Sequence, residues 1–215
     1  KIEEIIGLVM ESSGPRVNIG EVCRVYTNNQ DRFILAEVVG FRSDRVLLMP
    51  YEDLHGIGPG SIVEATGDVL KIPVGEQLIG RLLNGFGQPI DGLGDLHGMA
   101  TYPVSSTPSN PLDRERIHQR INFGIKAIDA LLTCGKGQRM GIFSGSGVGK
   151  STLMGMIARN IESDVNVIAL VGERGREVRD FMEKDLTEEG LKKSVLVVAT
   201  SDQPAMMRLK CAMVA

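Results

Sequence analysis

Tryptophan is absent from this chain of 215 residues, and aromatic side chains make up only 4% of it. An excess of either charge is also lacking, since 24 Lys and Arg stand against 27 Asp and Glu, a formal net charge of −3. Proteins that grip single-stranded nucleic acid need aromatic stacking platforms and a basic groove. The composition therefore argues against a nucleic-acid-binding protein.

Cysteine is scarce as well. The three cysteines are odd in number and lack the spacing of a metal site, which indicates reduced, partly buried thiols. They are Cys23, Cys134 and Cys211. No run approaches the roughly 18 apolar residues of a membrane-spanning helix, and the start of the chain has no signal-peptide pattern. We therefore expect a cytoplasmic protein.

Short runs of β-branched and apolar residues fill the chain from residue 1 to about residue 70. Turn-forming residues, such as Gly58, Pro59 and Gly60, separate them. The strand-like runs are 21–26, 33–39, 45–49 and 61–65. Short strands at this spacing are typical of a small barrel or sandwich. We predict a β-barrel over residues 1–70.

Residues 71–215 begin with glycine-rich loops and a charged run at 113–116 that we expect to be a solvated face. After Cys134 strands and helices alternate. The expected elements are a strand at 139–143, a helix at 151–161, a strand at 165–171, a helix at 176–188 and a strand at 194–199. Near-continuous apolar runs such as 165–171 are typical of strands buried on both faces. The alternation predicts an α/β fold with a parallel sheet.

The two ends of the chain do not carry the usual signals of a complete protein. It starts with Lys1 rather than methionine, and a helix-forming run at 204–215 stops without a C-terminal capping residue. We expect the chain to be part of a longer protein.

A glycine-rich loop lies between the expected strand at 139–143 and the helix that follows. It consists of Gly145, Ser146, Gly147, Val148, Gly149, Lys150, Ser151 and Thr152. Glycine residues let the backbone turn its N–H groups toward an anion, and the next helix directs its N-terminus to the same place. In such a loop Lys150 can reach the β- and γ-phosphates, and the Ser151 hydroxyl can ligate Mg²⁺. The loop predicts binding of a nucleoside triphosphate, namely ATP, although Ser144 replaces the first glycine of the full pattern.

Two carboxylates are candidates for the chemistry on the phosphate. Glu173 follows the apolar run 165–171, so it is expected at the carboxyl edge of the sheet beside the loop, where it can orient a water. A strand-end ion pair or a helix N-terminal acid explains its position equally well. Arg174 can meet phosphate or the Glu173 charge. Asp202, which follows the run 194–199, competes as a Mg²⁺-associated carboxylate.

Several motifs occur in an order that resembles one family. They are residues 72–81, 84–91, 124–129 and 137–143, the phosphate loop, and residues 172–178. Together they closely resemble the catalytic subunits of rotary F/V-type ATPases and their relatives in protein export, over the whole chain. Residues 172–178 with 200–205 look most like the flagellum-specific export ATPase, whose closest relatives energise type III secretion.

The resemblance implies a fold, a site and a setting. The fold would be a small ring-building β-barrel followed by a RecA-like ATPase domain, incomplete here, over residues 71–215. Glu173 would be the catalytic glutamate, and Lys150 and Ser151 would contact phosphate and Mg²⁺. The Mg²⁺-associated aspartate, an arginine supplied by the neighbouring subunit, the adenine pocket and a helical domain would all lie beyond residue 215, so these 215 residues alone are expected to be inactive.

The implied protein is a homo-oligomer, a hexamer, that hydrolyses ATP for flagellar or type III protein export. Its partners would be export-apparatus and stalk or regulator proteins, exported substrates and their chaperones, which hold it peripherally at the inner face of the cytoplasmic membrane. The alternatives are a rotary ATP synthase or ion-pump subunit, a RecA-like nucleic-acid translocase, and a binding module that does not hydrolyse ATP.

Overall fold

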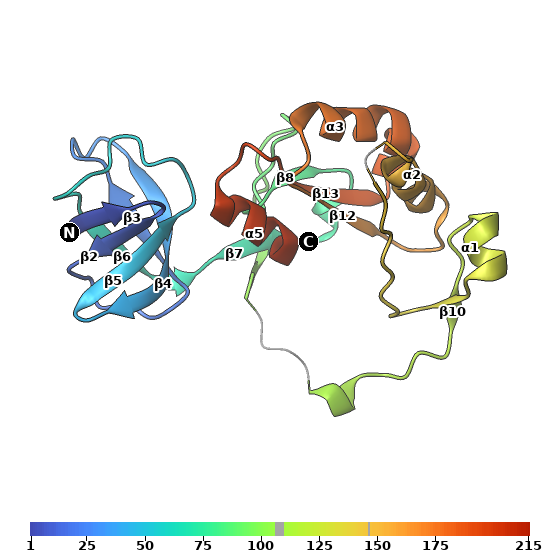
Figure 1. The fold of residues 1–215 in the computed structure, drawn as a ribbon, viewed down its shortest axis with the longest axis horizontal. Coiled ribbons are helices and arrows are strands. Elements are labelled where there is room, and N and C mark those ends of the chain that lie inside the picture. Colours follow the sequence, from blue (N-terminus) through green and yellow to red (C-terminus); the bar gives the residue numbers. More distant parts are fainter. Residues whose placement is uncertain (106–109, 146) are drawn as a thin grey trace.

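The N-terminal part of the chain is a β-barrel (Figure 1). A computed structural model describes residues 1–105, 110–145 and 147–215. The barrel sheet has the strand order β1-β2-β5-β4-β3-β6, and all of its pairings are antiparallel. Its strands are β1 (Ile2–Ile6), β2 (Val9–Ser12), β3 (Glu21–Tyr26), β4 (Phe33–Arg42), β5 (Arg45–Pro50) and β6 (Val63–Val69). The Ile2 amide donates to the Ser61 carbonyl over 2.8 Å, which closes the sheet on itself.

Alternating side chains fill the barrel, as the period of two along a strand requires. In β5 every second residue is buried, and the core includes Met10, Val25, Val38 and Leu48. The predicted barrel is confirmed. The four strand-like runs lie on β3, β4, β5 and β6, although β6 begins at Val63 and not at residue 61. Strands β1 and β2 were not predicted from the sequence.

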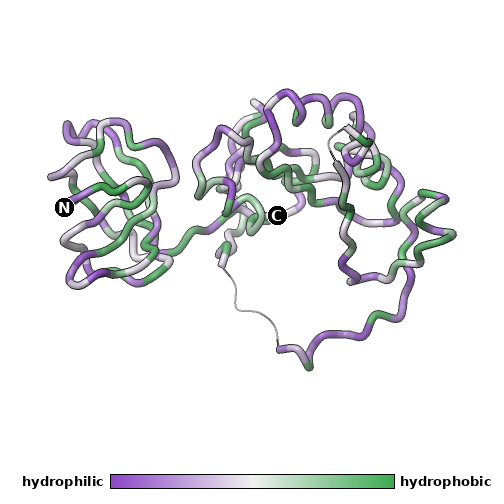
Figure 2. The backbone as a smooth tube through the Cα atoms, viewed as in Figure 1, coloured by the Kyte–Doolittle hydropathy of each residue, from purple (hydrophilic) through white to green (hydrophobic). Residues whose placement is uncertain are grey.

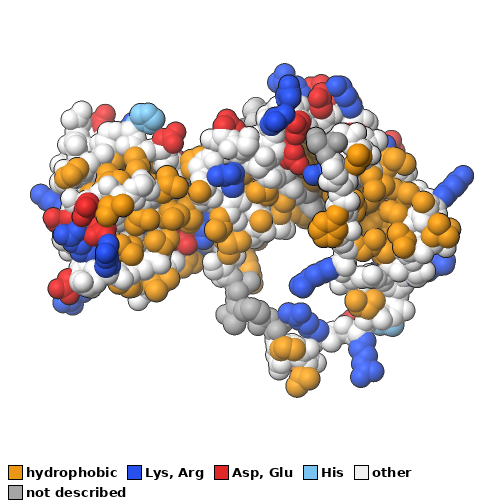
Figure 3. All heavy atoms as spheres, in the orientation of Figure 1, with side chains coloured by type: hydrophobic (Ala, Val, Ile, Leu, Met, Phe, Trp, Pro, Cys, Tyr) orange, Lys and Arg blue, Asp and Glu red, His pale blue; other side chains and the backbone are white. Residues whose placement is uncertain are grey.

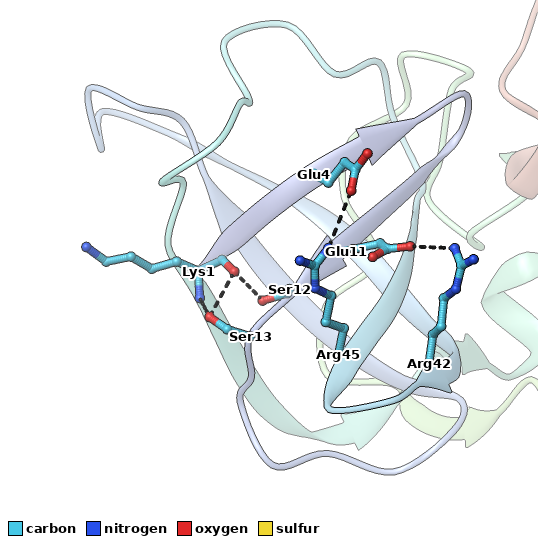
Figure 4. Close-up of polar contacts among 7 residues, drawn as sticks. All are labelled: Lys1, Glu4, Glu11, Ser12, Ser13, Arg42 and Arg45. Carbon is cyan, nitrogen blue, oxygen red and sulfur yellow. Dashed lines mark hydrogen bonds and ion pairs between the residues drawn. The ribbon is translucent and has the colours of Figure 1, made fainter.

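Strand β2 carries a buried carboxylate, which breaks the apolar alternation (Figure 4). Glu11 is 7% exposed at its side chain and lies 2.8 Å from Arg45 and 3.3 Å from Arg42. The hydrogen bond from Arg45 lowers the pKa of Glu11. The strand therefore depends on cations that only the folded barrel brings to it.

The second part of the chain is built on a three-stranded parallel sheet of order β12-β13-β8. Its strands are β8 (Leu82–Asn84), β12 (Asn166–Val171) and β13 (Ser194–Ala199). The helical segments are α1 (Lys126–Leu131), α2 (Lys150–Asn160), α3 (Gly175–Asp180), the π-helical η3 (Phe181–Leu186), α4 (Thr187–Leu191) and α5 (Ala205–Val214). Apolar residues follow the strands, whereas the outer helix α3 is largely hydrophilic (Figure 2). The predicted parallel sheet is confirmed.

Smaller elements lie between the barrel and α2 along the chain. They are β7 (Lys71–Val74), η1 (Glu76–Leu78), β9 (Ala100–Pro103), η2 (Pro111–Asp113), β10 (Arg120–Ile121) and β11 (Cys134–Gly135). The half-turn after β8 is held by Asp91, whose carboxylate accepts from Arg81 over 2.7 Å and from the amides of Leu82 and Leu93. In the part of the chain that the structure describes, no helix has the length and apolar character needed to cross a membrane.

Two of the expected strands differ from the prediction. Residues 139–143 form no strand, because no neighbouring strand pairs with them in the described chain, and Phe143 is 96% exposed. Strand β12 is buried on one face only, since Val167 and Val171 are exposed. An apolar run indicates that a strand can be buried on both faces. It does not show whether another element of the chain packs on each face. Hydrophobic side chains also gather on the surface around α1 (Figure 3).

Candidate functional site

Two glycines shape the loop that leads into α2. Gly149 has φ of 98° and is the N-cap of α2, and Gly147 has φ of 75°. Both angles lie in the left-handed region that other residues avoid. Gly145 does not adopt a positive φ, and Ser146 lies outside the described residues. The chain therefore turns directly into a helix whose first residue is Lys150.

Helix α2 is fixed by packing on both sides. Leu153 and Ile157 pack against the small core around Ile128, and Gly155 lies against η3. A Cβ at Gly155 would lie 2.5 Å from the carbonyl oxygen of Asp185, so only glycine permits this approach. The close contact sets the direction of the helix N-terminus, where unpaired N–H groups and the helix dipole favour an anion.

Glu173 reaches the same place from the sheet. Strand β12 ends at Val171, and Gly172, with φ of 73°, turns the chain so that Glu173 precedes α3. Its carboxylate Oε1 lies 3.5 Å from the Lys150 Nζ. A cavity of about 400 Å³ separates the loop from this strand end. It is lined by Gly145, Gly147, Gly149, Lys150, Ser151, Thr152, Glu173 and Glu177.

The cavity combines a cation, backbone donors and a carboxylate. The Lys150 side chain is 48% exposed and that of Glu173 is 35% exposed, so both are accessible from the cavity. A polyphosphate seated on the α2 N-terminus would attract Lys150 away from Glu173 and free the carboxylate to accept a hydrogen bond from water. The arrangement supports transfer of a phosphoryl group to water.

The site also fits Mg²⁺. In the described residues there is no cluster of three His, Cys, Asp or Glu side chains that would hold a metal by itself. Mg²⁺ in phosphate-transfer sites rarely uses such clusters, since it takes few protein oxygens and completes its shell with phosphate and water. The Ser151 side chain, on the first turn of α2, lines the cavity, as this arrangement requires.

The structure does not bring Arg174 and Asp202 into the cavity lining. Arg174 is mostly exposed and faces Glu177 at 3.7 Å, one turn along α3. Asp202 is exposed, and a hydrogen bond from Thr200 lowers its pKa. Glu177 lines the cavity but was not among the sequence candidates. Glu177 follows Glu173 by four residues, close to a predicted helix start. This spacing was the one sequence feature that could have placed both carboxylates at the cavity.

Two domains of one family match this chain. The ATP synthase alpha/beta family beta-barrel domain matches residues 2–67, and the nucleotide-binding domain of the same family matches residues 124–215. The flagellum-specific ATP synthase of Bacillus subtilis is 56% identical over 213 residues, which are 99% of this chain and 49% of that protein. The chain thus spans about half the length of the curated relatives it matches.

Solved structures agree with this match. The assembled ATPase EscN from the type III secretion system of enteropathogenic E. coli has a TM-score of 0.88 and 42% identity, and the match covers 99% of this chain and 51% of EscN. EscN in complex with its central stalk EscO has a TM-score of 0.87 at 42% identity, and covers 100% of this chain and 52% of that chain. The barrel, the parallel sheet and the phosphate loop occur here in the arrangement of these ATPases. The chain belongs to the ATP synthase alpha/beta family.

Proposed function

We propose that the full-length protein is a ring-forming ATPase that couples ATP hydrolysis to flagellar protein export by the type III pathway. The observation that carries the proposal is the meeting of Lys150 and Glu173, 3.5 Å apart, across the cavity of the phosphate loop. The names of relatives that are 40–56% identical support the export role.

Each residue of the loop has a role in this proposal. The amides of Gly145 and of residues 147–152 surround the phosphates, and Lys150 binds the β- and γ-phosphates. A phosphate contact from Ser146 stays a prediction. Ser151 would hold Mg²⁺, which would neutralise charge on the phosphates. Glu173 accepts a hydrogen bond from the attacking water and directs its oxygen to the γ-phosphorus. A role for Arg174 on the transferred phosphate stays a prediction.

The proposal extends to assembly. Residues 1–70 form the barrel domain that builds a hexameric ring, and residues 71–215 form part of the ATPase domain. A stalk or regulator protein, export-apparatus proteins, substrates and chaperones are the proposed partners. They hold the protein at the inner face of the cytoplasmic membrane. The solved complex of EscN with EscO supports an oligomer with a stalk partner.

The test is phosphate release by the purified full-length protein, followed by identification of the proteins that co-purify with it. Hydrolysis together with flagellar export components is the expected result. Membrane stalk subunits of an ion pump would instead favour a rotary ATP synthase, the second candidate, because the matched domains are shared with that enzyme. Absence of hydrolysis would contradict both.

A further inference from the structure

A buried ion pair joins the barrel to the last helix of the described chain. The Lys210 Nζ, on α5, lies 2.7 Å from Oε2 and 2.9 Å from Oε1 of Glu37, on β4. Their side chains are 5% and 13% exposed. The Tyr51 hydroxyl donates to the same carboxylate over 2.6 Å. Three polar groups from both parts of the molecule therefore pair with one another largely shielded from water.

Apolar side chains surround this group. Val22, Tyr51 and Met206 form a buried cluster, and the Tyr51 ring stacks on Phe86 with centroids 4.4 Å apart. Burial raises the pKa of Tyr51, so its hydroxyl stays protonated and keeps donating. Removing two charges from water costs about as much as their attraction returns, so such a pair fixes geometry more than it adds stability. Here the ion pair fixes the position of α5 against the barrel.

Helix α5 is linked to Glu173 by a short run of backbone. The helix begins at Ala205, directly after the loop that follows β13. In this loop the Ser201 amide donates to the Glu173 carbonyl over 3.0 Å. The neighbouring Gly172 amide donates to the carbonyl of Ala199, the last residue of β13, over 2.7 Å. The loop at 200–204 therefore connects α5 to the backbone of Glu173.

We propose that Lys210 is a positioning residue for Glu173, through which the barrel sets the geometry of the hydrolytic carboxylate. The ion pair with Glu37 seats α5, α5 sets the loop at 200–204, and the Ser201 amide holds the Glu173 backbone. A loss of this anchor changes the alignment of water with phosphate more than it changes nucleotide binding, because the phosphate loop and α2 are not part of the link. The inference rests on the proposed ATPase function.

The experiment measures ATP hydrolysis by the full-length protein with Lys210→Met, which keeps the length of the side chain and removes its charge. We expect kcat to fall about tenfold while KM for ATP stays within about threefold. Combined with Glu173→Gln, Lys210→Met should add less than about a twofold further loss, because both changes act on one carboxylate. A kcat of Lys210→Met within twofold of wild type, or a full additional loss in the combined variant, would overturn the inference.

Two further variants separate positioning from stability. Arg45→Met also leaves a buried carboxylate short of a cation, but on the outer side of the barrel, and its kcat should stay at the wild-type value. Glu37→Gln with Lys210→Met removes the unpaired buried charge, so the melting temperature should recover while kcat stays low. Recovery of kcat together with melting temperature would show a purely structural pair and overturn the inference. An inactive wild-type protein would instead contradict the proposed function, before any variant is compared.

Discussion

The Lys150 ammonium has one anionic partner among the described residues, the carboxylate of Glu173. Since the loop otherwise offers neutral amides, Lys150 supplies the charge-assisted contact to phosphate. We predict that Lys150→Ala in the full-length protein raises the Kd for ATP with Mg²⁺ by about 10- to 100-fold, the loss expected for a hydrogen bond to a charged group, and abolishes hydrolysis. Isothermal titration measures the Kd. Lys136→Ala, at an exposed lysine outside the cavity, is the control, and an unchanged Kd in Lys150→Ala would refute the loop assignment.

Glu173 stands at a strand end, where an ion pair and a catalytic role look alike in sequence. We predict that Glu173→Gln retains ATP binding and lowers hydrolysis at least about 10²-fold, the scale of losing a general base. Phosphate release and nucleotide titration on one preparation separate the two effects. Glu183→Gln, at an exposed carboxylate on the helical stretch that follows Glu173, should hydrolyse normally. Normal turnover by Glu173→Gln would make the carboxylate structural.

Sequence reasoning located the phosphate loop and Glu173 because both follow from local pattern. Glycine spacing predicts a turn, and the end of a parallel strand predicts an edge of the sheet. Glu177 was not among the predicted residues. Arg174 was expected to meet phosphate or the Glu173 charge, whereas the structure pairs it with Glu177. Side-chain direction at a helix start depends on the neighbouring element, which spacing alone does not define.

Among the elements, β8 is followed by a turn that a nearly buried carboxylate, Asp91, stabilises. The Asp91 and Arg81 side chains are 12% and 13% exposed, and the hydrogen bond from Arg81 holds the pKa of Asp91 well below its usual range. We predict that Asp91→Asn lowers the free energy of unfolding by about 3 kcal/mol at pH 7, because it leaves a buried guanidinium without its anion. Urea unfolding followed by circular dichroism measures the loss.

The sign of the pH dependence follows from the lowered pKa. The carboxylate contributes stability that is fully present above its unfolded pKa of about 3.9 and is lost as the pH falls through the lower folded pKa. The difference between wild type and Asp91→Asn should therefore be constant from pH 7 to pH 5 and shrink below about pH 4. Asp68→Asn, in an exposed pair with Lys71, should change stability by less than about 1 kcal/mol. An Asp91→Asn protein as stable as wild type at pH 7 would contradict this account.

The elements that were predicted well are those whose apolar pattern is unbroken within their own residues. Strand β13 is buried at every residue and was predicted with its observed bounds. Strand β2 was missed because Glu11 breaks its apolar pattern, and the arginines that neutralise it come from the β4–β5 hairpin. The prediction of a strand at 139–143 was wrong, because a strand needs a neighbouring strand for its backbone hydrogen bonds. The sequence of these residues alone cannot show whether such a neighbour is present.

At the scale of the whole molecule, the cavity has a cation, a carboxylate and backbone donors, but no arginine among its described lining residues. An arginine from a neighbouring subunit is worth roughly 10³–10⁵ in rate where such residues have been measured. We predict that these 215 residues bind ATP weakly, discriminate little between ATP and GTP, and do not hydrolyse either. Phosphate release, compared with the full-length protein, measures this, and turnover within about tenfold of full length would contradict it.

The seat of α5 on the barrel has a consequence during synthesis. All strand pairings of the barrel sheet lie within Ile2–Val69. This part of the chain can therefore fold as soon as it leaves the ribosome. Strand β8, in contrast, pairs with β13, more than a hundred residues later in translation, and Glu37 meets Lys210 later still. Contacts between segments so far apart form late, because closing a long loop costs entropy before it gains contacts. A nascent chain should thus present a finished barrel well before it can hold a nucleotide.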